Sequence, residues 1–393
     1  MEIKLIDVLE NLAVEGQEIV KKHNKIPGGK NGPYNDLETP VRNSSHWIMI
    51  FSKIYKLSKQ KKYLDSIYKL AEYIISNEAR PYGYSFFHRN KKRKDKCNGL
   101  IGQAWTFESL IKASEILQDE KYSKIAIEVF NQHPFNEKYG LWNRVEIDGN
   151  IFSFDGTFNH QLWFASSASS IIENNDKIIE QKINIFLNYV KNNLTTMNDG
   201  LIFHQIKWIW RRRLLRSYLF NAIAKSTYKN IELLLREGKL SFKYTKISDF
   251  EKERIKKEIY RSVGYHCFNL YAFAILKNNF PEHKLWQNPI LDKTLRYIFT
   301  DKYFIDIEHN KYGFPYNAPG FEIPFILFTF FKNNHKDYQK QIEKWLNIQF
   351  KKSYNIEKNW FSNNNPDPLT LTSRFYEITR LPDNIFNEIN INI

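Results

Sequence analysis

The sequence is poor in cysteine, with only Cys97 and Cys267 among its 393 residues. Two cysteines can form neither a disulfide framework nor a four-cysteine zinc site, and such scarcity is typical of a reducing compartment. The N-terminal segment lacks the continuous apolar stretch of a signal peptide. The most hydrophobic run, FEIPFILFTFF (321–331), is too short to span a membrane and contains Glu322. We therefore expect a cytoplasmic protein.

Familiar cofactor and metal motifs are also missing. The chain contains no P-loop, no dinucleotide-binding glycine motif, no HExxH zinc motif and no nucleophile elbow. We therefore expect neither a cofactor nor a metal. A zinc site built from Cys97, His266 and Cys267 is the alternative, but YHCFN (265–269) reverses the Cys-His-Gly order of the zinc-binding lanthionine cyclase toroids.

The charge balance is strongly basic, with 58 Lys and Arg against 43 Asp and Glu and a formal net charge of +15. Such an excess can attract nucleic acid, anionic lipid or acidic glycans. No zinc-finger spacing, RNP motif or leucine zipper accompanies it, so we expect no nucleic-acid partner. Much of the charge lies in two runs, HRNKKRKDK (88–96) and KWIWRRRLLR (207–216).

What the chain has in abundance is a repeated helical hairpin. Six times, a loop rich in Gly, Asn and Pro leads into a helix rich in aromatic and small residues. These first-type helices begin near Ser45, Asn98, Asn159, Tyr265, Phe321 and Thr370. Their spacing of roughly 50–60 residues, with one longer gap before the fourth, indicates a repeat architecture.

Five of the six helices are followed by an amphipathic helix with one apolar stripe and one Lys/Glu face. Helices that are apolar all round are typically buried, and helices with one stripe are typically outer. The sixth has no such partner, but residues 3–23 form an amphipathic helix with no inner helix before it. We therefore predict an all-α (α/α)6 toroid of six helical hairpins whose N-terminal helix closes the ring. An open helical solenoid is the alternative.

The whole chain, 1–393, is predicted to be one toroid domain, because no Pro/Gly/Ser-rich linker divides it. The longer gap, 195–263, is predicted to be a basic insertion between the third and fourth hairpins. Its run 207–216 belongs to a basic amphipathic helix, which can bind a membrane surface or a protein partner weakly. We favour the alternative that this helix packs across the barrel with its arginines in solvent.

The loops that enter the inner helices should line one mouth of the ring, and the loop FDGTFNHQLW is the richest in functional groups. Asp155 begins a turn, and Thr157 or Asn159 can cap the helix that follows. His160 then lies in the first turn, where the helix dipole disfavours the protonated imidazole. A neutral histidine of this kind can act as a general base. Alternatively, His160 and Gln161 only bind loop carbonyls.

The loop CNGLIGQAWTFE offers a second group of polar residues. Asn98 is expected to cap the second inner helix, and Gln103 and Trp105 can face the axis. Glu108 lies deeper along the same helix. Because a buried carboxylate is costly unless it is paired, Glu108 must be either ion-paired or functional.

Two further carboxylates, Glu322 and Glu377, lie on strongly apolar helices and raise the same question. Arg374 precedes Glu377 by three residues, a spacing that predicts an ion pair along one helix face. We favour that structural interpretation for this pair.

Near the first inner helix, Glu38, Arg42 and His46 are spaced by four residues. This spacing aligns side chains on a helix, but Pro40 is expected to begin the helix after Glu38. His46 is predicted to lie at the same mouth as Asp155, His160, Gln103 and Tyr316, because the loops enter the inner helices at equivalent points of the repeat.

A rigid aromatic loop precedes the fifth inner helix. Tyr312, Tyr316 and Asn317 flank Pro315 and Pro319 there. Aromatic side chains suit the apolar faces of sugar rings, and a phenol adds a hydrogen-bonding tip. The loop therefore indicates a carbohydrate ligand.

The segments CNGLIGQAWTFESLIKA and DGTFNHQLWFA resemble the VpsJ-like proteins of exopolysaccharide and capsule gene clusters. More broadly, the repeat pattern resembles the six-hairpin glycosidase-like toroids, which include unsaturated glucuronyl hydrolases, N-acylglucosamine 2-epimerases and toroidal polysaccharide lyase domains. The resemblance implies work on a carbohydrate in or near polysaccharide biosynthesis. It does not determine the reaction, because one fold supports many activities.

Hydrolysis is one chemistry that fits these residues. A glycoside hydrolase needs a carboxylic acid and a second carboxylate or an activated water. Asp155 together with Glu108 or Glu322 could supply these groups.

Proton transfer at a sugar carbon is the second chemistry that fits these residues. A lyase or a C5-epimerase of uronic acids needs a base, an acid and a group that neutralises the carboxylate, and His160, Tyr316 and Arg42 or Arg374 could fill these roles. An isomerase of the 2-epimerase kind would use paired His and Glu, for which His46, His160 and His266 are candidates.

We predict a carbohydrate-active enzyme of the glycoside hydrolase or lyase type, acting on an anionic oligo- or polysaccharide. The alternatives are a sugar epimerase or isomerase, and a non-catalytic glycan-binding or scaffold subunit of a polysaccharide synthesis complex. The expected catalytic residues are Asp155, His160, Glu108 and Tyr316. The expected substrate-binding residues are His46, Arg42, Trp47, Asn98, Gln103, Trp105, Asn159, Gln161, Trp163, His266, Asn317, Glu322 and Arg374.

Overall fold

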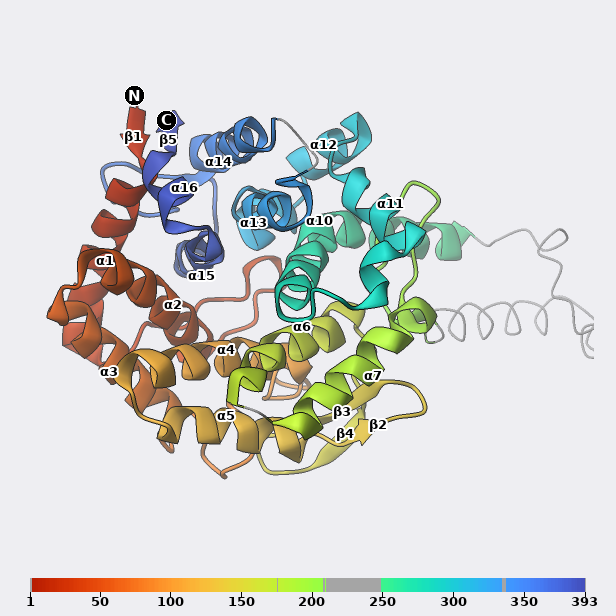
Figure 1. Cartoon of the computed structure of the whole chain (residues 1–393), viewed down its shortest axis with the longest axis horizontal. Helices are drawn as coiled ribbons and strands as arrows, with labels where there is room; N and C mark the ends of the chain where they lie inside the picture. The colour runs from red at the N-terminus through yellow and green to blue at the C-terminus, as the bar shows by residue number, and fades with distance from the viewer. Residues whose placement is uncertain (1, 175, 208, 210–248, 334–336, 393) are drawn as a thin grey trace, which may run out of the picture.

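The helices lie in two concentric rings around a common centre (Figure 1). The structure is a computed structural model that describes the chain except for residues 1, 175, 208, 210–248, 334–336 and 393. The predicted (α/α)6 toroid is therefore confirmed. None of the helices in the described part is both long and apolar enough to cross a membrane.

The inner ring consists of six helical segments that are buried over most of their surface. They are α2 (Val41–Ser58), α4 (Gly99–Leu117), α6 (Phe158–Ala168), the C-terminal half of α10 (Asp249–Asn279), α13 (Pro319–Phe331), and α15 (Pro368–Ser373) with its 3-10 continuation η5 (Arg374–Arg380). In α4, every residue from Gly99 to Leu110 is buried. A surface helix would instead show one apolar stripe.

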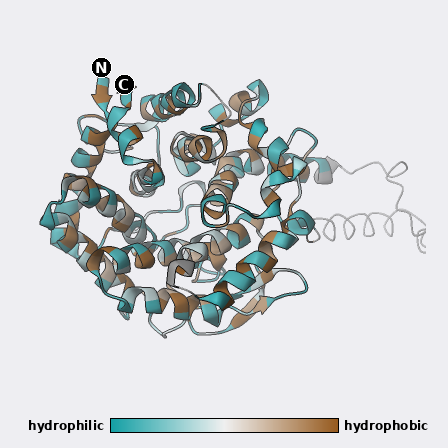
Figure 2. Ribbon diagram, in the orientation of Figure 1, coloured by the Kyte–Doolittle hydropathy of each residue, from teal (hydrophilic) through white to brown (hydrophobic). Residues whose placement is uncertain are grey.

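The outer ring consists of amphipathic helices that pack on the inner ring. They are α1 (Leu5–His23), α3 (Lys61–Ile75), α5 (Lys121–Gln132), α7 (Lys177–Asn193), the pair α11 (Pro289–Tyr297) and α12 (Asp301–Glu308), and α14 (Tyr338–Ser353). Their hydrophobic residues face the inner ring and their hydrophilic residues face outward (Figure 2). The short elements are the 3-10 helices η1 (Gly32–Tyr34), η2 (Ser169–Asn174) and η3 (Lys284–Gln287), and the π-helix η4 (Gly313–Asn317).

The two ends of the chain close the ring. Strand β1 (Glu2–Lys4) pairs antiparallel with strand β5 (Asn390–Asn392). Helix α1 packs against α2, α3 and α16 (Asp383–Glu388). The first and last inner helices are also in contact, because the Trp47 indole N–H donates to Ser373 Oγ at 3.1 Å. The open solenoid is therefore excluded.

A small β-sheet between α5 and α6 was not expected from the sequence. It consists of β2 (Phe135–Asn136), β3 (Leu141–Val145) and β4 (Ile151–Phe154) in antiparallel order. Gly149, with φ of 86°, allows the turn between β3 and β4. Strand β4 ends directly before Asp155 and so delivers that residue to the start of α6.

The N-terminal end of the predicted insertion, 195–263, belongs to the toroid body. Leu201, Ile202 and Ile206 are fully buried, and the Ile206 N–H donates to the Gly156 carbonyl at 3.1 Å. At the other end, α10 begins well before the predicted start of the fourth inner helix. The centre of the insertion, with most of the basic run 207–216, lies outside the described residues.

Replacing Gly16 with alanine should lower the stability of the protein, because a methyl group there would clash with the Trp47 ring. Alanine favours a helix over glycine by about 1 kcal/mol, but overpacking costs roughly 1–3 kcal/mol, so we expect a net loss. Thermal and urea unfolding check this. Glu18→Ala, an exposed change on the same helix, should shift stability by less than about 0.5 kcal/mol. A stabilised Gly16→Ala variant would contradict the packing of α1 on α2.

Candidate functional site

A cavity of about 190 Å³ lies where the loops enter the inner helices. We call it the axial cavity. Residues from all six repeats line it: Asn31, Tyr34, Asp36, Arg89, Lys94, Asn98, Ile101, Trp105, Thr157, Asn159, His160, His204, Arg261, Tyr265, Phe268, Tyr316, Asn317 and Arg374. A larger hollow of about 400 Å³ lies between α7 and α11, but it is lined by none of the predicted site residues.

An Asp–His pair stands on one side of the axial cavity. His160 Nδ1 lies 2.7 Å from Asp155 Oδ2. Because a carboxylate only accepts hydrogen bonds, Nδ1 carries the proton and Nε2 is the nitrogen available to a ligand. Asp155 is buried, and only 23% of the His160 side chain is exposed. This arrangement orients the imidazole as the base of a catalytic pair is oriented.

The backbone around Asp155 is built to hold its carboxylate. Its oxygens accept the N–H groups of Thr157 at 3.1 Å and Leu100 at 3.2 Å. Gly99, with φ of 61°, permits the close approach, because a Cβ there would clash with the carboxylate. Burial alone would raise the pKa of Asp155, but His160, Arg144 and the Leu100 N–H outweigh it and lower that pKa to about 2.

A second histidine and a group of tyrosines face this pair. The His204 ring lies 4.6 Å from the Tyr265 ring, centroid to centroid. Tyr265 Oη lies 2.8 Å from Tyr34 Oη, and the Tyr316 hydroxyl donates to Asn31 Oδ1 at 2.5 Å. Burial and the nearby Arg261 and His160 hold the pKa of His204 well below its usual value. His204 is therefore neutral at physiological pH.

Two arginines close to the tyrosines of the cavity, Arg42 and Arg374, are fully buried. Arg374 Nη2 lies 2.6 Å from Glu322 Oε1 and 2.7 Å from Glu377 Oε1, which confirms the ion pair predicted from the Arg374–Glu377 spacing. Arg42 Nη1 lies 3.2 Å from Glu38 Oε1. A buried cation is tolerated when it is paired in this way.

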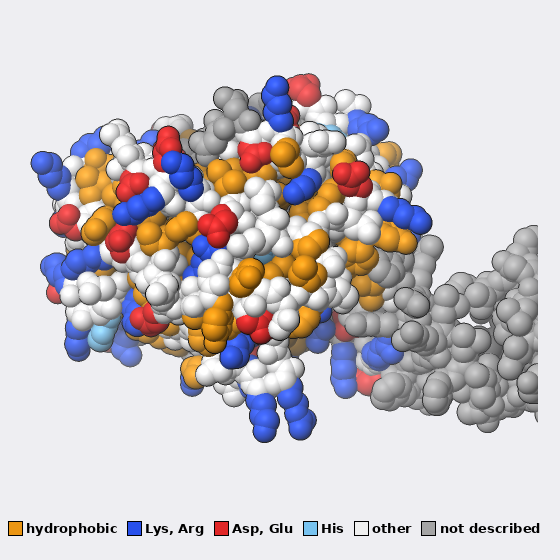
Figure 3. Space-filling model, turned by 90° about the horizontal axis from the view of Figure 1, so that it is seen from below, with side chains coloured by type: hydrophobic (Ala, Val, Ile, Leu, Met, Phe, Trp, Pro, Cys, Tyr) orange, Lys and Arg blue, Asp and Glu red, His pale blue; other side chains and the backbone are white. Residues whose placement is uncertain are grey.

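The rim of the cavity is basic. Asp36 is the sole carboxylate among the lining residues named above. Its Oδ2 lies 2.5 Å from Lys94 Nζ and 3.7 Å from Arg89 Nη1. Viewed from below, the body carries basic side chains interspersed with acidic and apolar ones (Figure 3). Among the side chains that line the cavity, cations therefore outnumber carboxylates.

Both glutamines predicted to bind substrate hold loops in place instead. Gln103 accepts the Phe86 N–H at 2.8 Å and donates to the Cys97 carbonyl at 2.8 Å. Gln161 accepts the Trp142 N–H at 2.9 Å and donates to the Trp142 carbonyl at 2.8 Å. Their polar atoms are satisfied by backbone groups, so neither amide is available in the cavity.

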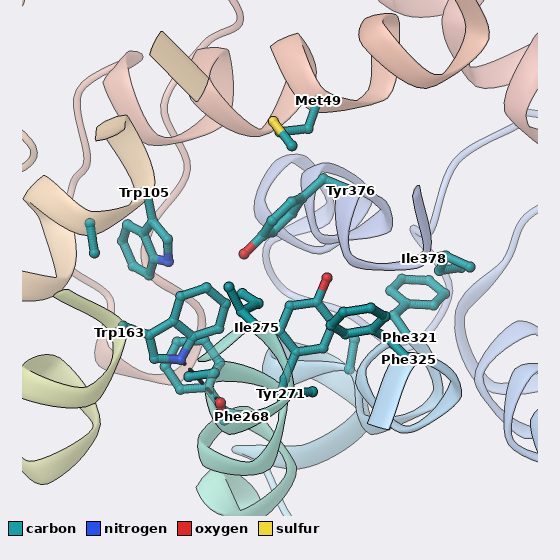
Figure 4. Close-up of a cluster of buried hydrophobic side chains, with 14 of the residues drawn as sticks. Met49, Trp105, Trp163, Phe268, Tyr271, Ile275, Phe321, Phe325, Tyr376 and Ile378 are labelled. Carbon is teal, nitrogen blue, oxygen red and sulfur yellow. Dashed lines mark hydrogen bonds between the residues drawn. The ribbon is translucent and has the colours of Figure 1, made fainter. Parts of the chain in front are cut away.

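Several other predicted residues belong to the core. The Trp163 indole donates to the Phe268 carbonyl at 3.0 Å, as the dashed line in Figure 4 shows, and Trp47 is tied to the last inner helix. His266 Nδ1 accepts the Ile202 N–H at 3.3 Å and Nε2 lies 3.0 Å from the Thr294 carbonyl. Both imidazole nitrogens of His266 are thus used within the fold.

Two predicted residues lie deeper along the axis than the cavity. The Glu108 carboxylate is in contact with the Arg380 guanidinium, so it is ion-paired. His46 stacks on Tyr376 at 4.1 Å between ring centroids, and Tyr376 points toward the centre of the inner cluster in Figure 4. Burial and the charges of Arg42 and Arg374 hold the pKa of His46 well below its usual value.

Sequence reasoning missed part of the lining. Asn31 and Tyr34 lie in a loop whose polar and aromatic content was a usable signal. His204 and Arg261 lie within 195–263, which had been assigned to an insertion. An antiparallel bridge between Thr157 and Gln205 brings His204 beside α6, and no sequence pattern announces such a long-range pairing.

Comparison with known proteins places the chain in a family. No protein-family model matches it. The "Archaeal glycosylation protein Q" of Haloferax volcanii is 36% identical over 379 residues, which cover 96% of this chain and 98% of that protein. The chain belongs to the archaeal glycosylation protein Q family.

Solved structures with this family's fold include three sugar-acting enzymes. Cellobiose 2-epimerase from Bacillus thermoamylovorans B4167 has a TM-score of 0.65 at 9% identity, covering 95% of this chain and 98% of that chain. A D-mannose isomerase has 0.57 at 12%, covering 94% and 95%. Unsaturated glucuronyl hydrolase from Bacillus sp. GL1 has 0.58 at 10%, covering 96% of each. These likenesses show the shared six-hairpin toroid.

The low pKa of Asp155 should appear in acid unfolding. A carboxyl whose pKa is lowered on folding adds stability above its unfolded pKa, and this stability is lost as the pH falls through the folded value. The difference in unfolding free energy between wild type and Asp155→Asn should therefore shrink by about 2 kcal/mol from pH 4 to pH 2. Urea titrations at several pH values measure it. The exposed Asp148→Asn is the control, and a pH-independent difference for Asp155→Asn would contradict the assignment.

Burial, opposed by Arg374 and the other nearby arginines, raises the pKa of Glu377 to about 8. A carboxyl with a raised pKa adds stability below its unfolded pKa, and this stability is lost as the pH rises toward the folded value. Wild type should therefore lose stability relative to Glu377→Gln between pH 5 and pH 8, so the difference between their melting temperatures should change with pH. The exposed Glu343→Gln should show a pH-independent difference from wild type. Identical pH profiles for wild type and Glu377→Gln would show that the carboxyl is ionised throughout.

Proposed function

We propose that the protein is a sugar epimerase or isomerase that moves a proton at a carbon of a carbohydrate in glycan metabolism. The observation that carries this proposal is the Asp155-oriented His160 facing a cavity whose lining, among the described residues, has Asp36 as its one carboxylate, and Asp36 is held by Lys94. The curated relative is named as a glycosylation protein, which supports a carbohydrate ligand. The exopolysaccharide setting indicated by the sequence resemblance stays a prediction.

The carboxylates around the cavity do not favour hydrolysis. A glycoside hydrolase needs two carboxyl groups that flank the scissile bond. Asp36 is held by the rim cations, and Asp155 is engaged with His160 and backbone N–H groups. Glu108 is paired with Arg380 away from the cavity. The hydrolase or lyase type placed first by the sequence therefore becomes the alternative.

The Asp155–His160 pair suits abstraction of a proton from a carbon next to a carbonyl group. His160 Nε2 would take the proton from carbon, and the electron pair of the C–H bond would move into an enediolate. Asp155 would stabilise the imidazolium that forms. A proton delivered by solvent to the other face of the same carbon inverts it, while His160 releases its proton to solvent. Return of the His160 proton to the neighbouring carbon, with the electron pair re-forming a carbonyl, isomerises the sugar.

The oxygen that receives the charge would be stabilised by neutral donors. A neutral imidazole can polarise a carbonyl without giving up a full proton, and His204 is neutral. Burial keeps the pKa of the Tyr265 phenol well above its usual value, so Tyr265 is protonated and can donate a hydrogen bond. Such fixed dipoles, aimed at the oxygen on which charge develops, stabilise that charge.

Solvent exchange tests the proposal. Aldoses, ketoses and hexuronic acids would be incubated with the protein in D2O and examined by NMR for deuterium bound to carbon. We expect one carbon of an accepted sugar to gain deuterium. His160→Ala should slow this exchange by at least about 100-fold, the usual contribution of a general base, because no other group would take the proton.

The control variant is His309→Ala, which removes an exposed histidine outside the cavity and should leave exchange unchanged. His160→Ala should keep its melting temperature within a few degrees, because a side chain at the rim of a cavity contributes little packing. Exchange that persists in His160→Ala, or sugars that release a new reducing end without carbon-bound deuterium, would contradict the proposal.

A further inference from the structure

Three side chains deep in the axial cavity carry polar atoms without a hydrogen-bond partner in the described part of the chain. They are the Trp105 indole N–H, both amide atoms of Asn159, and the Nε and Nη1 groups of Arg374. Trp105 is 4% exposed, Asn159 1% and Arg374 0%. Buried polar groups are nearly always paired in native proteins. Three such exceptions in one cavity indicate a position that a ligand fills.

The unpaired atoms are mainly donors. Trp105 offers one N–H, Arg374 offers N–H groups on a cationic guanidinium, and Asn159 offers an NH2 group. Their counterpart must therefore be rich in acceptors. Donors from a tryptophan, an amide and a guanidinium on three separate inner segments, α4, α6 and η5, are suited to a group with several oxygens.

The surrounding charge gives the sign of that group. Among the residues that line the axial cavity, Arg89, Lys94, Arg261 and Arg374 are cationic, whereas Asp36 alone is acidic. Carboxylates behind the lining also pair with three of these cations: Asp95 with Arg89, Glu258 with Arg261, and Glu322 and Glu377 with Arg374. Arg42 adds a further guanidinium directly behind the Trp105 ring, 4.1 Å from its centroid. Clefts lined by one sign of charge concentrate ligands of the opposite sign.

The aromatic packing keeps these donors in place. The Arg374 guanidinium lies 4.9 Å from the centroid of the Phe268 ring, and its Nη2 is held by Glu322, Glu377 and the Asn317 carbonyl. The Nη2 edge of the Arg374 guanidinium is thus fixed before any ligand binds to its Nε and Nη1 groups. Such preorganisation reduces the entropy that binding costs.

We propose that Trp105, Asn159 and Arg374 form an anion subsite in the axial cavity, which binds a carboxylate or phosphate group carried on the sugar. This assignment rests on the proposed function for the sugar, but not on its reaction. Charge-assisted hydrogen bonds from Arg374, together with those from Trp105 and Asn159, would fix the ring relative to His160. The small volume of the cavity, below the roughly 300–1,000 Å³ of typical ligand pockets, suits one sugar unit.

Calorimetric titration of the full-length protein with three probes tests the subsite. The probes are glucuronate, glucose 6-phosphate and glucose, so that carboxylate, phosphate and neutral sugar are compared. At least one acidic probe should bind about 10- to 100-fold more tightly than glucose, because glucose lacks the charged group that accepts the hydrogen bonds of the subsite. The probe that binds more tightly identifies which anion the subsite accepts.

Two conservative variants avoid the risk that removing Arg374 leaves Glu322 and Glu377 unpaired. Trp105→Phe removes the N–H but keeps an aromatic ring, and Asn159→Leu removes the amide at similar volume. Each should weaken the acidic probe by about tenfold or more and affect glucose little. Because the Asn159 amide is unpartnered, Asn159→Leu should also keep or raise the melting temperature of the free protein.

The matched control is Asn193→Leu. Asn193 is buried on an outer helix and donates to the Tyr139 carbonyl at 2.9 Å, so its loss should lower the melting temperature and leave probe binding unchanged. Equal affinity for glucose, no binding of either acidic probe, or unchanged affinity in both cavity variants would overturn the subsite. If the subsite is overturned but a neutral sugar still exchanges deuterium, the proposed function stands. If an acidic probe binds tightly but no sugar exchanges deuterium, the subsite stands and the proposed reaction is overturned.

Discussion

Closure of the ring is the constraint on which the site depends, because the axial cavity is lined by residues from all six repeats. The antiparallel pairing of β1 with β5 and the contact between Trp47 and Ser373 hold the first and last repeats together. A chain of the same helices left open would keep each hairpin but would separate Arg374 from Trp105 and His160. The chemistry is therefore a property of the closed ring and not of any single motif.

Much of the fold could be predicted from periodicity, because an all-apolar helix and a one-stripe helix leave different sequence patterns. The unpaired first and last helices indicated closure. The sheet before α6 and the return of His204 to the cavity could not be predicted, because both depend on pairings between segments far apart or on short strands without a clear alternation. Residues 201–206 of the predicted insertion are packed into the toroid body beside such a long-range pairing, between Thr157 and Gln205.

The segments CNGLIGQAWTFE and FDGTFNHQLW each contain residues that hold loops in place as well as residues at the cavity. Gln103 and Gln161 occupy similar places in successive repeats and hold the preceding loop by its backbone. Asp155 and His160, from the same segment, form the pair at the cavity. A polar residue at the start of a buried helix can thus either hold the preceding loop or face the cavity, and sequence spacing alone does not distinguish the two roles. The pairing of Arg374 was predictable, because an i,i+3 contact is local.

We propose that the cavity moves a proton on a sugar that otherwise stays whole. The most direct test is the mass of an accepted sugar or oligosaccharide recovered after incubation with the protein in D2O. We expect one carbon-bound deuterium in a molecule with an unchanged number of sugar units. A shortened product with a new reducing end and no carbon-bound deuterium would contradict it and would assign the cavity to hydrolysis.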